Sequence, residues 1–130
     1  MSAIEFDLAA AERQVFEAQL SLEKGNHEES ARTAYQAMLR AAQALVKLEL
    51  QDAPSDPDVI VKEFTTRFYD TQKLFDPFAG GKFAQYLFAA HAEAGKHADA
   101  DTARYRIDEA QLFIDAAHSC YNKFGAVTVA

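Results

Sequence analysis

The sequence predicts an all-α fold, an up-down antiparallel bundle of four to five helices. Apolar residues recur at intervals of three and four along almost the whole chain, which is the spacing of one helix face. No segment alternates apolar and polar residues for long enough to indicate a strand, and glycine (5) and proline (3) are scarce. With 130 residues, we expect a single domain over 1–130, with a core over about 4–124 and a short C-terminal tail at 125–130.

The first two helices are predicted to form a hairpin. Lys24 and Gly25 indicate the end of the first helix, because glycine readily adopts the left-handed conformation that ends helices. Asn26 is the predicted N-cap of the second helix, and Glu29, three residues later, completes a capping-box pattern. The second helix carries two adjacent apolar stripes, so we expect it at the centre of the bundle. One stripe of the first helix is formed by Ile4, Leu8, Ala11, Val15, Ala18 and Leu22.

A loop over residues 51–58 separates this hairpin from the rest of the chain. Asp56 followed by Pro57 predicts the start of a third helix, because aspartate caps helices and proline favours the first helical position. Its aromatic and apolar residues continue this helix to about residue 74.

Two more helices are predicted in the second half of the chain. Asp76, again followed by proline, predicts the start of a fourth helix that runs to about residue 95, with a break at the glycines at 80–81. Asp101 is the expected N-cap of a fifth helix, which Gly125 ends.

Charge and composition limit the classes of function. The chain has 13 Lys and Arg against 20 Asp and Glu, a formal net charge of −7, which argues against broad nucleic-acid binding. Cys120 is the single cysteine and forms no internal disulfide; residues 1–8 contain acids rather than a signal peptide; and no window is long and apolar enough for a membrane span. We therefore expect a soluble, cytoplasmic protein with no membrane interaction.

The sequence offers no complete catalytic or metal site. His91 and His97 are six residues apart, which on one helix places them roughly 120° out of register, a poor arrangement for two metal ligands. Cys120 follows His118 by two residues, so the pair does not meet locally on a helix, and the thiol is expected in the core. Lys82 follows two glycines, but Phe83 follows it where a phosphate loop needs Ser or Thr. We expect no metal and no cofactor.

Basic residues and histidines supply the candidate ligand-binding positions. Arg40 and Lys47 share a polar stripe of the second helix, with Arg32 near its N-terminal end, and these cations either contact phosphate or simply form a solvated helix face. His91, Lys96 and His97 are the other candidates, grouped near the end of the fourth helix.

Aromatic residues are dense in the middle of the chain, and they either fill the core or form a dimer face. A bundle of this length leaves part of so large an apolar surface exposed, so we expect a homodimer with Phe68 and Tyr86 as interface candidates. The eight rings are Phe64, Phe68, Tyr69, Phe75, Phe78, Phe83, Tyr86 and Phe88.

Residues 25–45, with an Ala-Tyr-x-Ala-Met run followed by Ala-Ala-x-Ala-Leu, and residues 109–115 resemble the HEPN family (higher eukaryotes and prokaryotes nucleotide-binding). The resemblance covers roughly 8–124 and implies a HEPN-like helical bundle that commonly dimerises. Tetratricopeptide hairpins have similar features, but no second copy of the pattern returns one repeat later.

The resemblance implies two classes of function. Ribonucleases of the family carry an arginine followed, after four to six residues, by histidine, and no arginine stands at these positions before His91 or His97. We therefore expect a non-catalytic HEPN-type binding or partner protein, with a nucleotide or a nucleotidyltransferase subunit as its partner. The alternatives are a ribonuclease with a non-standard site around His91, Lys96 and His97, or a purely structural dimerisation module.

Overall fold

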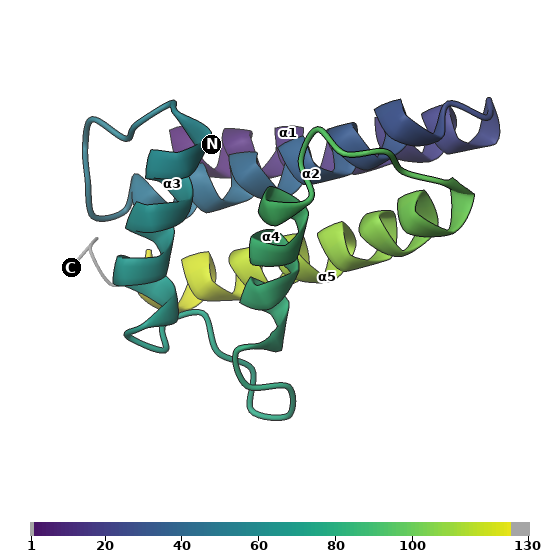
Figure 1. Cartoon of the computed structure of the whole chain (residues 1–130). Coiled ribbons are helices and arrows are strands. Elements are labelled where there is room, and N and C mark those ends of the chain that lie inside the picture. Colours follow the sequence, from purple (N-terminus) through teal and green to yellow (C-terminus); the bar gives the residue numbers. More distant parts are fainter. Residues whose placement is uncertain (1, 126–130) are drawn as a thin grey trace.

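The computed structural model describes residues 2–125, which form five α-helices and one π-helical turn, without a β-strand (Figure 1). The predicted all-α class is confirmed for this part of the chain. The predicted tail lies, from residue 126 on, outside the described residues. The elements are α1 (Ala3–Glu23), α2 (His27–Val46), α3 (Pro57–Phe64), the π-turn η1 (Thr65–Tyr69), α4 (Lys82–Ala92) and α5 (Ala100–Phe124).

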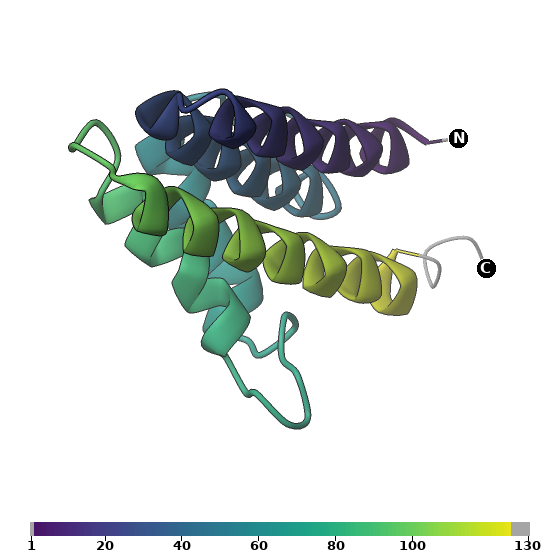
Figure 2. The ribbon, with the colours of Figure 1, turned by 90° about the vertical axis from the view of Figure 1, so that its right-hand side faces the viewer.

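The long helices α1, α2 and α5 run side by side, and the shorter α3 and α4 cross them (Figures 1 and 2). α2 packs against α1, α3, α4 and α5, as its two apolar stripes predict. Six of its nine buried residues are alanine or serine, which lets neighbouring helices approach closely. The core therefore lies around α2.

Aromatic rings fill the core between α3, η1 and α5. The Phe64 ring centroid lies 5.6 Å from that of Phe113 and 6.0 Å from that of Phe68. Phe68, expected at a dimer face, is instead a core residue with no exposed surface, whereas Tyr86 is half-buried. The exposed rings of the central cluster are Phe75 and Phe78, in the loop before α4.

Asn26 is the N-cap of α2 as predicted, but the capping contacts of α2 and the cap residue of α5 differ from the prediction. Gly25 has φ +80° and ends α1 as expected, but the Asn26 side chain makes no capping hydrogen bond, so the predicted capping box is wrong. Instead, buried Ser30 donates to the Ala18 carbonyl at 2.8 Å and ties α2 to α1. The N-cap of α5 is Asp99 rather than Asp101, because Asp99 has an extended backbone from which its carboxylate accepts the Thr102 N–H.

The third helix ends in a π-turn at residue 69, not near 74. The Asp70 N–H donates to the Thr65 carbonyl, five residues back.

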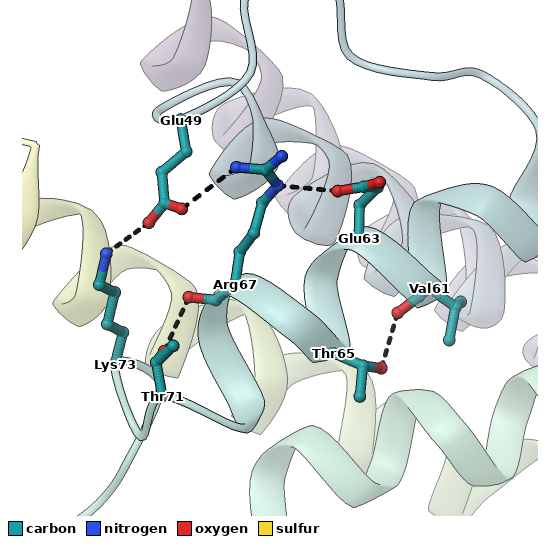
Figure 3. Close-up of polar contacts among 7 residues, drawn as sticks. All are labelled: Glu49, Val61, Glu63, Thr65, Arg67, Thr71 and Lys73. Carbon is teal, nitrogen blue, oxygen red and sulfur yellow. Dashed lines mark hydrogen bonds and ion pairs between the residues drawn. The ribbon is translucent and has the colours of Figure 1, made fainter.

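A cluster of paired charges, which we call the Arg67 cluster, joins this turn to the end of α2 (Figure 3). Arg67 pairs with Glu63 at 2.8 Å and Glu49 at 3.5 Å, and Glu49 also pairs with Lys73. Every charge of the cluster has a partner within it, which gives it a structural role.

The fourth helix begins later than expected. Asp76 accepts hydrogen bonds from the N–H groups of Phe78 and Ala79, but this turn does not continue, and α4 starts at Lys82. Gly80 has φ +63°, and a Cβ on Gly81 would come within 2.9 Å of the Tyr69 ring. The glycines at 80–81 therefore interrupt the helix, as predicted.

Candidate functional site

A cavity of about 520 Å³ lies between the first half of α2, the turn after α4 and the first turns of α5. It exists because α4 ends at Ala92 while α2 and α5 extend further, and residues 93–99 cross from α4 to α5 (Figure 1). Its volume falls within the range of small-molecule sites. We call it the α2–α5 cavity; it is lined by Glu28, Ala31, Arg32, Tyr35, Gln36, Ala89, Ala90, Glu93, Ala94, Gly95, Lys96, His97, Ala98, Thr102, Tyr105, Arg106 and Glu109.

Helical spacing brings the polar side chains of the cavity together. On α2, Glu28, Arg32 and Tyr35 follow one another at intervals of four and three; on α5, Arg106 and Glu109 are three apart. Each set borders the apolar stripe that packs α2 against α5. The cavity wall is therefore the polar edge of the α2–α5 contact.

Arg106 is the deepest charge of the cavity, with 4% of its surface exposed. Its guanidinium has five N–H donors. Nη1 donates to Glu109 Oε1 at 3.3 Å, and within residues 2–125 no other hydrogen bond satisfies the group. Its Cζ lies 5.4 Å from the centroid of the Tyr105 ring, which is 48% exposed. Burial is the main reason that the pKa of Glu109 is raised, although Arg106 opposes the shift.

The remaining charges lie near the mouth of the cavity. Arg32 is exposed and has no hydrogen-bond or ion-pair partner among the described residues. Lys96 Nζ is 3.9 Å from Glu93 Oε2, and His97 Nδ1 is 2.6 Å from Glu28 Oε1. The cavity lining thus contains three cations, Arg32, Lys96 and Arg106. It also contains three carboxylates, Glu28, Glu93 and Glu109.

Tyr35 lines the cavity, and hydrogen bonds to residues outside it hold this side chain in place. These bonds link three helices. Its Oη lies 2.7 Å from His91 Nδ1, and His91 Nε2 lies 2.7 Å from Asp58 Oδ1. A carboxylate only accepts, so Nε2 carries a proton, and in the neutral imidazole Nδ1 then accepts from the tyrosine hydroxyl. Burial first, then Asp58 and Asp56, raises the pKa of Tyr35, so the hydroxyl keeps its proton. Tyr35, His91 and Asp58 follow one another as the nucleophile, base and carboxylate of a catalytic triad do. Here the phenol keeps its proton, and the hydrogen bonds only hold it in place.

The structure separates the binding positions expected from the sequence. Lys96 and His97 line the α2–α5 cavity. His91 does not line it and supports Tyr35 instead. Arg40 and Lys47 both pair with Asp7 of α1, at 3.3 and 2.6 Å, so they link two helices away from the cavity.

The cavity residue that sequence reasoning missed is Arg106. Its position on α5, three residues after Ala103 and four before Ala110, places a charge on the apolar face of the helix. A charged residue in an apolar stripe is the signal that points to it. Tyr35 and Tyr105 carry no comparable signal, because half-buried tyrosines are common in helical bundles.

Other chemistry in the described part of the chain is limited. No group of three or more His, Cys, Asp or Glu among residues 2–125 is arranged to hold a metal ion. Cys120 is buried, and burial is the main factor that raises its pKa to about 11. A smaller cavity of about 200 Å³ lies beside the loop before α4, lined in part by Phe75, Phe83 and Leu112. Within these same residues, no helix is both long enough and apolar enough to cross a membrane.

The comparisons with known proteins do not add a family. No protein-family model matches the chain, and no curated protein matches it.

Proposed function

We propose that this chain is a cytoplasmic, non-catalytic binding protein with a HEPN-like, up-down helical bundle, and that it binds a nucleotide in the α2–α5 cavity. Arg106 carries this proposal. Only one of its nitrogens has a protein acceptor within the described residues, and none of the others is among the fully buried polar atoms without a partner, so they are open to a ligand. An anion in the cavity would supply acceptors for these donors.

The shape and lining of the cavity support a nucleotide over a simple anion. Tyr35 and Tyr105 come from two different helices and border the same space. Bases stack readily on aromatic side chains, and arginine binds phosphate through a planar fork. Arg32, which is free of protein partners among residues 2–125, adds a second cation for the phosphate.

Titration calorimetry with nucleotides tests this function. Arg32→Ala removes an exposed cation of the cavity, and we expect it to weaken binding several-fold without unfolding the protein. Arg104→Ala is the matched control, since Arg104 is also exposed and pairs with Asp101 outside the cavity. A saturating nucleotide at 100 times its Kd should also stabilise the fold by about 2.7 kcal/mol. If Arg32→Ala and Arg104→Ala lost nucleotide affinity equally, the cavity would not be the binding site.

The two alternatives predict different results. A ribonuclease with a non-standard site cleaves labelled RNA and loses cleavage in His91→Ala or His97→Ala. A purely structural dimerisation module shows no change in melting temperature with any nucleotide. A nucleotidyltransferase subunit as partner is tested by co-purification with such a subunit, with and without nucleotide.

We also propose that the chain forms a homodimer. Phe78 is 99% exposed and Phe75 52%, and Phe75 lines the smaller cavity, whose wall also includes exposed Leu112. Exposed apolar groups of this size are typical of contact surfaces. This patch, on the loop that projects below α4 in Figure 1, takes the place of Phe68 as the interface candidate.

A further inference from the structure

The α2–α5 cavity has features that choose among nucleotides by the number of their phosphate groups. This selectivity rests on the proposed function, because it presupposes that the cavity binds a nucleotide.

The first feature is the depth of the anion anchor. Arg106 has 4% of its surface exposed and sits at the base of the cavity, while Arg32 and Lys96 lie near its mouth. The bond from Arg106 to Glu109, at 3.3 Å, is longer than the 2.7–2.9 Å usual for a charge-assisted hydrogen bond. The guanidinium therefore has both the room and the free donors for one terminal phosphate.

The second feature is the balance of charge. Arg32, Lys96 and Arg106 are accompanied by Glu28, Glu93 and Glu109 in the same lining. A phosphate monoester carries about −1.5 to −2 at neutral pH, a charge close in size to that of the two arginines it would contact directly. A triphosphate brings further negative charge next to three carboxylates, and like charges at short range disfavour it.

The third feature is the position of the aromatic ring. Tyr105 is half exposed, and the Arg106 Cζ lies 5.4 Å from its ring centroid. A phosphate on Arg106 and a base on Tyr105 are thus close neighbours, which suits a ligand with one phosphate next to its base-bearing sugar. A long polyphosphate would push the base away from the tyrosine.

We infer that the cavity selects a nucleoside monophosphate, with its phosphate on Arg106 and Arg32 and its base against Tyr105. Glu109 competes with the phosphate for Arg106. Removing the Glu109 charge should therefore strengthen phosphate binding, which a purely structural Arg106–Glu109 pair would not do.

Calorimetry on the full chain tests this with AMP, GMP, adenosine, guanosine, ATP and inorganic phosphate. We expect a monophosphate to bind about ten-fold or more tightly than its nucleoside, and ATP to bind no more tightly than AMP. Tyr105→Ala should weaken AMP binding but leave binding of inorganic phosphate unchanged. Glu109→Gln should tighten AMP binding several-fold, and Arg106→Met should abolish the preference for AMP over adenosine. Arg106→Lys keeps a charge if the Met variant does not fold.

The outcomes separate this inference from the proposed function. If no compound binds, both fail. If the nucleosides bind as tightly as the monophosphates, or ATP binds more tightly than AMP, the monophosphate inference fails while nucleotide binding stands. Unchanged or weaker AMP binding in Glu109→Gln would equally overturn the role given to Arg106.

Discussion

The hydrogen-bonded chain of Tyr35, His91 and Asp58 joins α2, α4 and α3, so it should contribute to stability in a way that its geometry specifies. Tyr35→Phe removes the hydroxyl alone and leaves the ring in place. His91→Ala removes the acceptor for Tyr35, the donor to Asp58, and the ring that packs 5.9 Å from Tyr35. If the two residues act through one shared bond, their effects on the free energy of unfolding must overlap.

The structure gives the sizes of these effects. The Tyr35–His91 bond is partly buried, and its loss should cost about 1 kcal/mol. His91→Ala should cost about 2 kcal/mol, because contacts of the ring are lost as well. The Asp58 side chain is 86% exposed, so solvent screens its contact and Asp58→Asn should cost less than about 0.5 kcal/mol. For a chain of this length, 1 kcal/mol corresponds to roughly 4 °C in melting temperature.

A double-mutant cycle measures the overlap. Urea unfolding is followed by far-ultraviolet circular dichroism for the wild type, Tyr35→Phe, His91→Ala and the double variant. We expect a coupling energy of about 1 kcal/mol between the two substitutions. Additive losses would show that the bond contributes nothing, and a larger loss in Asp58→Asn than in Tyr35→Phe would contradict the assignment of the main contact to the tyrosine.

Three further predictions follow from single contacts. Cys120, with its pKa raised to about 11, should resist alkylation in the folded protein and react on unfolding; because the folded state holds this proton more tightly, the wild type should lose stability relative to Cys120→Ala as pH rises from about 8.5 towards 11. Asp7→Ala should destabilise the α1–α2 hairpin by about 1 kcal/mol in urea unfolding and leave nucleotide affinity unchanged, since Asp7 binds Lys47 at 2.6 Å away from the cavity. In sedimentation equilibrium, Phe78→Glu should turn a dimer into a folded monomer while Phe16→Glu on the outer face of α1 does not; a wild-type mass near 14.4 kDa would refute the dimer.

Helix existence and order could be predicted because they depend on local periodicity. The end of α1 and the start of α3 are indicated by Gly25 and by Asp56 with Pro57, which act within a few residues of their own position. The π-turn at residues 65–69 could not be predicted, since it depends on packing of the turn and on pairing of Arg67 with Glu49, eighteen positions away. The predicted start of α4 was wrong for a similar reason, because the turn at Asp76 satisfies its own hydrogen bonds without a helix.

The candidate site was predicted in part, and the division has a physical cause. Lys96 and His97 stand out in sequence because they are polar residues in a turn. Arg40 and Lys47 stand out equally, yet both pair with Asp7, more than thirty residues earlier. Whether a cation is available to a ligand depends on its tertiary partner, and one helix stripe does not reveal that partner.

The α2–α5 cavity follows from the difference in helix length more than from any motif. α4 has 11 residues and α5 has 25, so α4 cannot cover the whole contact between α2 and α5. Where α4 stops, the apolar stripe of α5 still continues, and the residue at that point is Arg106. An apolar side chain there would close the gap and stabilise the bundle, as replacement of buried charges by apolar groups often does. An arginine leaves a partly satisfied charge in an open space between two tyrosines. This arrangement sacrifices packing at one end of the bundle, and the anion that we propose for the cavity would supply acceptors for the guanidinium there.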